Sequence, residues 1–418
     1  MMIKKYVVGL AKIFEKISSK VELNLGIKRK ITTLIPKTII EKIDSLLVST
    51  HDINTHHYTF RPRHEPSYDP KKNLSQFTKL FDLEINKIKK EIKEDKNKYI
   101  GLELPEGMKK FISELSLYLE KELKKKVVIS SEPCFGACDI KHHQFESVGI
   151  KTIIHMGNGA IPNVKLPNGI KVIFIPLYIN IPIKKTVDRS IKYFKKNSIS
   201  NVGIISSISF IKNVSEIKKL LRSNDITAHT ASGNKRLSLP AHVLGCNASS
   251  ALPIKDKVDI FAMYENGSFH APAVSLTTKS DVVCFDPLTE DTIFYSYDKL
   301  KQKALEERSA NLEKISKAKR VGLLISSKVG QNRSKMIYKL EEMYSKKGYK
   351  TTILISDYID PKSLETTDFD LIIASMCPRV SIDERKLFSK PLLTIPEAME
   401  FIQTKSVNKN EFKFDQFS

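Results

Sequence analysis

Three cysteines in separate short motifs are the residues of this 418-residue chain whose types and spacing could do chemistry. Cys138 lies in Cys-Phe-Gly-Ala-Cys-Asp, Cys246 in Val-Leu-Gly-Cys-Asn and Cys377 in Ser-Met-Cys-Pro-Arg. Thiolates are the soft ligands of iron–sulfur clusters, and four of them normally close a 4Fe–4S site. Three thiolates converging on one cluster would leave one iron free to bind a substrate. The polar, glycine and proline neighbours of these cysteines argue against burial as small apolar side chains, but spacing alone leaves both interpretations open.

The two other cysteines fit different roles. Cys284 alternates with apolar residues inside the run Asp281 to Asp286, which is typical of a core strand. Cys134 precedes Cys138 by four residues and is either a spare ligand or a spectator. Five cysteines are too few for a disulfide framework, and no signal peptide is visible, so we expect reduced thiols and a cytoplasmic protein. No apolar run reaches the roughly 18 residues of a membrane span.

The formal net charge of +22 raises the question of a nucleic-acid partner. Lysines are spread along the whole chain and mixed with acidic residues, which is typical of solvated helix faces. No helix-turn-helix, zinc-finger or RNA-recognition signature is present. We therefore expect no stable nucleic-acid or membrane partner, although the charge suits an acidic macromolecule. A basic RNA- or ribosome-associated binding protein with incidental cysteines is the non-enzymatic alternative.

The elements that must position the cysteines form three similar segments. Each segment opens on a short apolar strand with glycine at its third position, at Tyr99, Asn201 and Arg320, and continues by alternating helix and strand. This pattern predicts an α/β fold of three pseudo-repeated parallel-sheet domains around a central cluster site, with an N-terminal helical extension. In open α/β sheets ligands bind beyond the carboxyl ends of the strands, and all three cysteine motifs lie in turns next to strands that could face a shared centre.

We place the domain boundaries by the repeats. They are a basic N-terminal extension and linker at 1–75, a first repeat with Cys138 at 76–198, a second with Cys246 at 199–318, and a third with Cys377 and a C-terminal tail at 319–418. The apolar residues between Phe77 and Ile92 recur at helical spacing and predict one amphipathic helix at the start of the first repeat.

Short motifs in all three repeats resemble the diphthamide synthase family, in its archaeal type. The resemblance runs in order from about residue 77 to 402. The matching runs are Leu104 to Gly107, Pro133 to Asp139, Ile154 to Gly157, Leu244 to Asn247, Gly267 to His270, Phe285 to Pro287, Cys377 to Asp383 and Lys390 to Thr394. The first 75 residues have no counterpart in this comparison.

The resemblance implies a transferase with a 4Fe–4S cluster held by Cys138, Cys246 and Cys377. It implies non-conventional radical chemistry, in which S-adenosylmethionine bound at the open iron gives up its 3-amino-3-carboxypropyl group. The acceptor is C2 of a histidine in translation elongation factor 2, and methylthioadenosine leaves. This is the first step of diphthamide synthesis. The resemblance also implies a homodimer and an electron donor that remains to be identified.

Five residues in loops that match the family are expected to line the S-adenosylmethionine pocket. They are Gly157, Gly267, His270, Gln331 and Arg379. The alternative enzyme is a dehydratase similar to quinolinate synthase, in which three cysteines hold a cluster whose open iron acts as a Lewis acid on a small acid.

Overall fold

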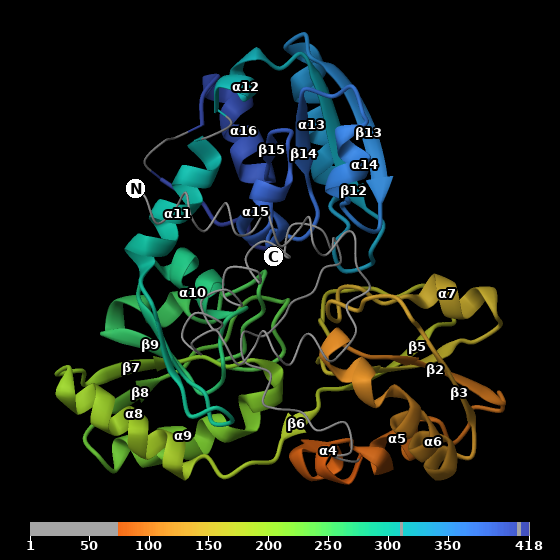
Figure 1. Cartoon of the computed structure of the whole chain (residues 1–418), viewed down its shortest axis with the longest axis vertical. Coiled ribbons are helices and arrows are strands. Elements are labelled where there is room, and N and C mark those ends of the chain that lie inside the picture. The colour runs from red at the N-terminus through yellow and green to blue at the C-terminus, as the bar shows by residue number, and fades with distance from the viewer. Residues whose placement is uncertain (1–73, 310–311, 408–410, 418) are drawn as a thin grey trace, which may run out of the picture. The chain divides into compact units, whose positions relative to one another are not determined.

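The computed structural model describes residues 74–418 except 310–311, 408–410 and 418 (Figure 1). The predicted N-terminal extension, except for its last two residues, lies outside the described part. All three repeats belong to one compact unit of the chain. None of the described helices is long and apolar enough to cross a membrane.

The first repeat is built on a parallel sheet in the order β3-β2-β4-β5. Its helix α6 buries Leu115, Leu119 and Leu123, which recur every four residues and so share one face against the sheet. The strands are β2 (Tyr99–Glu103), β3 (Lys126–Ile129), β4 (Thr152–Met156) and β5 (Lys171–Ile175), and the helices are α6 (Ile112–Leu123), α7 (His142–Ser147) and the 3₁₀ helix η1 (Glu106–Phe111).

The second repeat repeats this order as β8-β7-β9-β10 and adds the antiparallel edge strand β11. The strands are β7 (Asn201–Ile204), β8 (Thr227–His229), β9 (Ile260–Met263), β10 (Val282–Phe285) and β11 (Thr292–Tyr295). The helices are α9 (Val214–Arg222), α10 (Ala271–Thr278), α11 (Tyr297–Ser309) and α12 (Leu312–Lys317), with the 3₁₀ helices η2 (Ile208–Asn213) and η3 (Leu252–Lys257).

The third repeat has the same parallel order, β13-β12-β14-β15. The strands are β12 (Arg320–Ser326), β13 (Lys350–Ser356), β14 (Leu371–Ala374) and β15 (Leu392–Leu393). The helices are α13 (Ser334–Lys346), α14 (Pro361–Glu365), α15 (Val380–Asp383), the 3₁₀ helix η4 (Arg385–Leu387) and α16 (Ile395–Thr404).

The glycine at the third position of each opening strand has a packing reason. A Cβ added at Gly101 or Gly203 would lie 2.8 or 2.6 Å from the ring of Phe145 or Phe261, and one at Gly322 would lie 2.9 Å from Ile372. A large apolar side chain therefore lies against the bare backbone of each first strand. The common strand order and this common packing confirm the predicted fold of three parallel-sheet α/β repeats.

The predicted helix between Phe77 and Ile92 is wrong as a single element. The chain forms α4 (Leu74–Leu80), the short strand β1 (Phe81–Asp82) and α5 (Ile85–Glu91). The break occurs because β1 pairs antiparallel with β6 (Tyr178–Ile179) and because Glu84 takes a left-handed conformation with φ of 45°. The apolar residues of this segment nevertheless pack in the core of the first repeat, as their helical spacing predicted.

Two segments pack outside the repeat in which they begin. Helix α8 (Lys184–Lys196) buries Val187 and Phe194 in the core of the second sheet. The C-terminal residue Phe412 packs with Leu276 and Ala304 of the second repeat. The domain boundaries therefore remain a prediction. Residues on both sides of a predicted boundary contribute to the same hydrophobic core.

Candidate metal-cluster site

The three motif cysteines lie in loops that follow the sheet strands. Cys138 follows β3, Cys246 lies between β8 and β9, and Cys377 follows β14, and each is half-buried. Burial raises the pKa of the Cys138 thiol to about 11, and repulsion from Cys246 adds to the rise. Burial also raises the pKa of Cys377, with further contributions from Cys246 and Cys138. This repulsion acts between residues up to 239 positions apart in sequence, from Cys138 to Cys377.

The loop after β12 locks the Cys138 loop in place. The amide N of Gly330 donates to the carbonyl of Cys138 at 3.0 Å, and a Cβ at Gly330 would lie 2.4 Å from the Cys138 Cα. Only glycine allows this approach without movement. The next residue, buried Gln331, donates from Nε2 to the Cys138 Sγ at 3.3 Å. A hydrogen bond to sulfur favours the thiolate, which is the form that binds iron.

Arginines surround the thiols. Arg236 and Arg333 offset part of the rise in pKa that burial imposes on Cys246, and Arg379 does the same for Cys377. Arg236 also donates from Nη2 to the carbonyl of Gly330 at 2.7 Å, which joins the second repeat to the third. Guanidinium groups supply positive charge beside thiols that would bind a metal as anions.

A buried ion cluster joins the first and third repeats beside Cys138. Asp139 forms two ion pairs. Lys141 Nζ lies 2.8 Å from one carboxylate oxygen, and Lys328 Nζ lies 3.0 Å from the other. Both lysine ammonium groups also lie over the Tyr358 ring, at 4.5 and 4.2 Å from its centroid. Removing one partner would leave a buried charge uncompensated, so this cluster fixes how the two loops meet.

The three motif cysteines are not among the described groups whose ligand atoms lie close enough together for a single metal ion. Among the described residues, the tight group of three ligand atoms within 4.8 Å of one another is Glu103, Cys134 and His155, not the three motif cysteines. A cluster of several irons spaces its ligand sulfurs more widely than one ion does. Thiols that are neutral at pH 7 would release their protons to solvent when a metal binds, because the positive charge of iron favours the thiolate.

The group of Glu103, Cys134 and His155 lies in the first repeat. Glu103 Oε2 is 2.6 Å from His155 Nδ1, and Cys134 Sγ is 4.0 Å from the same nitrogen. Burial disfavours a charged imidazole, but Cys134 and Glu103 outweigh it and raise the pKa of His155 to about 10. Cys134 is thus a partner of His155. The sequence offered only the nearness of Cys134 to Cys138, and it gave no sign of this triad.

The five predicted pocket residues divide by their contacts. Gly157 and Gly267 both have positive φ, and a Cβ would meet Pro105 at 2.5 Å or the Cys284 sulfur at 2.2 Å. Local packing is therefore enough to explain both glycines. Cys284 itself is fully buried in β10, as predicted for a core residue.

His270 lies near Arg379, which is a neighbour of Cys377, whereas Gln331 contacts Cys138. Burial lowers the pKa of His270 to about 3, and nearby His242 and Arg379 lower it further. Arg379 binds Asp383 through two hydrogen bonds of 2.8 Å, while its Nη1 and both ring nitrogens of His242 are buried without a hydrogen-bond partner among the described residues. Buried polar atoms without partners are rare, and they mark a place for a polar ligand or water.

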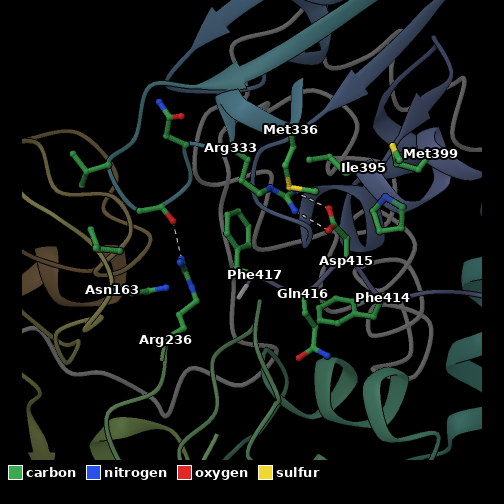
Figure 2. A pocket seen from close by; sticks show the side chains of 15 residues that line it. Asn163, Arg236, Arg333, Met336, Ile395, Met399, Phe414, Asp415, Gln416 and Phe417 are labelled. Atoms are coloured by element: carbon green, nitrogen blue, oxygen red, sulfur yellow. Dashed lines mark hydrogen bonds and ion pairs between the residues drawn. The ribbon is translucent and has the colours of Figure 1, made fainter. Parts of the chain in front are cut away.

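A pocket of about 590 Å³ is lined in part by Gly330, which contacts the Cys138 loop (Figure 2). Arg236, Arg333 and the C-terminal residues Phe414 to Phe417 line it, but none of the three motif cysteines or of the five predicted pocket residues does. Sequence reasoning missed Arg236 and the tail. No spacing signal could have found them, because each acts through contacts with residues far away in the chain.

Three parallel-sheet repeats, each with one cysteine motif in a loop beside its strands, define a three-repeat α/β protein whose thiols suit an iron–sulfur cluster. The sequence profile of the diphthamide synthesis protein family matches residues 104–413. The chain belongs to this family, as the resemblance of its motifs predicted.

Curated relatives agree with this assignment. The chain is 27% identical over 337 residues to 2-(3-amino-3-carboxypropyl)histidine synthase of Pyrococcus horikoshii, a match that covers 81% of this chain and 94% of the relative. It is 26% identical to the synthase of Methanocaldococcus jannaschii, covering 81% and 94%. It is 23% identical to subunit 1 of the synthase of Caenorhabditis elegans, covering 83% and 87%.

Solved structures agree as well. The crystal structure of Dph2 from Pyrococcus horikoshii is similar with a TM-score of 0.69 and 26% identity, and the match covers 81% of this chain and 94% of that one. A second crystal structure of the same protein, with a 4Fe–4S cluster, gives the same values.

Proposed function

We propose that this chain is a transferase for the first step of diphthamide synthesis, with Cys138, Cys246 and Cys377 as the ligands of a 4Fe–4S cluster. The observation that supports the proposal most is that hydrogen bonds join the three cysteine loops. Gly330 and Gln331 bond to Cys138, Arg236 of the second repeat bonds to Gly330, and Arg333 bonds to the carbonyl of Met376, directly before Cys377. Family membership supports the same activity, because the relatives are named 2-(3-amino-3-carboxypropyl)histidine synthase and a similar structure holds a 4Fe–4S cluster.

When bound, the cluster supplies the electron that cleaves the bond between sulfur and the γ-carbon of S-adenosylmethionine. The transferred group is 3-amino-3-carboxypropyl, and methylthioadenosine leaves. The protein binds and orients. Gln331 and the arginines favour the anionic form of the thiols, and Gly330 permits the close contact of two cysteine-bearing repeats.

His270 and Arg379 are our proposed contacts for S-adenosylmethionine. Within the described part of the chain, Nη1 of Arg379 and the ring nitrogens of His242 have no hydrogen-bond partner, which supports this because a carboxylate or amino group would satisfy them. Gln331 donates a hydrogen bond to the sulfur of Cys138, one of the proposed cluster ligands. Gly157 and Gly267 shape the loops through their positive φ values.

The protein substrate we propose is translation elongation factor 2, modified at C2 of one histidine. The relatives' activity supports a protein acceptor, and the net charge of +22 would steer an acidic partner. A homodimer, a cytoplasmic location and a separate low-potential electron donor complete the proposal and come from the family resemblance and from the free cysteines.

Cysteine variants and product analysis test the function together. The protein is purified and reconstituted without oxygen, given dithionite and S-adenosylmethionine, and its nucleoside products are separated. We expect methylthioadenosine from the wild type and loss of iron and product in Cys138→Ala, Cys246→Ala and Cys377→Ala. Cys284→Ala, the matched control in the core strand β10, should keep its iron.

Other products would overturn the assignment. 5′-Deoxyadenosine would indicate conventional radical chemistry. Iron-loaded protein that yields neither nucleoside would favour the Lewis-acid dehydratase. Full activity in one of the three cysteine variants would remove that cysteine from the ligand set, and a wild type that binds no iron would favour a binding protein.

A further inference from the structure

The last described residues of the chain, Phe414 to Phe417, contact the cysteine loop of the second repeat. We call residues 414–417 the C-terminal strap. The amide N of Phe417 donates to the carbonyl of Cys246 at 3.1 Å, and the side chain of Asn247 donates to the Phe417 carbonyl at 2.6 Å. Gln416 accepts from the amide of Ala248 at 2.9 Å. The strap is thus hydrogen-bonded to the residue that we propose as a cluster ligand and to the two residues after it.

The Phe417 ring links this loop to two arginines. The guanidinium carbon of Arg236 lies 4.6 Å from the ring centroid, and that of Arg333 lies 4.3 Å from it (Figure 2). Asp415, which is buried, holds Arg333 through two hydrogen bonds of 2.7 Å. Two guanidinium groups therefore contact one aromatic ring, and cation–π attraction stabilises both. Arg333 is stabilised further by its carboxylate partner Asp415.

Each arginine continues to a different cysteine loop. Arg236 donates to the carbonyl of Gly330, whose own amide donates to the carbonyl of Cys138. Arg333 donates from Nε to the carbonyl of Ser375 at 2.9 Å and from Nη2 to that of Met376 at 3.4 Å, directly before Cys377. Through Phe417 and its two arginines, the strap contacts the chain segments that carry all three cysteines.

We propose that Phe417 and Asp415 are positioning residues for the metal cluster: they hold Arg236 and Arg333 so that the three cysteine loops keep their spacing and the cluster keeps its neighbouring positive charge. This inference rests on the proposed function, because it takes the three cysteines as cluster ligands. The strap lies beyond residue 413, where the family match ends. Outer partners of metal ligands fix ligand orientation, and their loss typically costs about 10- to 100-fold in metal affinity or activity.

The central test compares Phe417→Leu with Phe417→Tyr in the full-length protein. Leucine keeps an apolar cover over the site but removes the aromatic face, whereas tyrosine keeps the face. We expect a chelator to strip iron from Phe417→Leu about 10-fold more readily than from the wild type, and Phe417→Tyr to restore wild-type resistance. Lys413→Ala, an exposed change just before the strap, is the matched control and should match the wild type.

A redox titration separates positioning from simple structural support. The cluster takes one electron from dithionite, and no bond forms or breaks in the protein. Phe417 is uncharged, so a change in midpoint potential must come through the groups that it positions. We expect a lower potential in Phe417→Leu, followed by electron paramagnetic resonance, because displaced arginines no longer stabilise the more negative reduced cluster.

The outcomes are distinguishable. Asp415→Asn removes the clamp on Arg333 at unchanged volume, so it tests the same linkage if leucine at 417 lowers the melting temperature of the apoprotein. If the wild type holds iron, and the Phe417→Leu and Asp415→Asn variants equal it in chelator resistance and midpoint potential, the inference is overturned but the proposed function stands. A wild type that binds no iron would overturn the proposed function and the inference with it.

Discussion

Gly330 is the point where the third repeat touches the backbone of the Cys138 loop. Replacing it with alanine would put a Cβ 2.4 Å from the Cys138 Cα and 2.7 Å from its Cβ. Ordinary contact begins at about 3.4 Å, so the two loops must separate by about 1 Å. Functional constellations tolerate displacements of only about 0.5 Å. The Gly330→Ala substitution therefore changes the spacing of the thiols as well as the packing.

Two magnitudes follow from this displacement. Overpacking a well-packed contact costs about 1–3 kcal/mol of the free energy of unfolding, and the obstructing atoms at Gly330 belong largely to backbone that cannot rotate away. The movement also lengthens the Gly330 to Cys138 and Gln331 to Cys138 hydrogen bonds. We expect iron binding to fall by about 10-fold or more, as for other losses in the surroundings of a metal site.

The assay is iron and sulfide content after anaerobic reconstitution, together with thermal unfolding of the apoprotein. Gly107→Ala is the matched control, because a Cβ there meets nothing within 4 Å. It should leave iron content and melting temperature at wild-type values. A Gly330→Ala protein with wild-type iron content and an unchanged melting temperature would refute the reasoning that this contact sets the position of Cys138.

Two further predictions concern the surroundings of the first-repeat cysteines. Gln331→Leu removes the donor to the Cys138 sulfur, so the midpoint potential of the cluster should fall in a redox titration; an unchanged potential at full iron content would contradict the role of that hydrogen bond. The pKa of His155 is raised to about 10 from about 6.5, so its contribution to stability is complete below pH 6.5 and is lost as the pH rises to 10. The melting temperature of the wild type should therefore fall across this window more steeply than that of His155→Gln, and parallel curves for the two proteins would show that the imidazole is not held protonated.

The repeated α/β plan was readable from the sequence because each strand is a short apolar run followed by a helix with one apolar face. The same logic failed between Phe77 and Ile92. There the apolar spacing was helical, but pairing of Phe81 and Asp82 with β6, about 100 residues later, replaced the middle of the helix by a strand. Local periodicity reports which residues face a core, and long-range pairing decides the backbone shape that brings them there.

The sequence by itself determined the three cysteine motifs, their positions after strands and the family, because these depend on residue types at short spacing. Only the tertiary structure decided that Cys134 pairs with His155 and Glu103, and that Arg236, Arg333 and Phe417 surround the proposed cluster ligands. These contacts join residues from 21 to 181 positions apart. They arise where separate repeats and the C-terminal strap meet, and no local pattern encodes the relative placement of surfaces so distant along the chain.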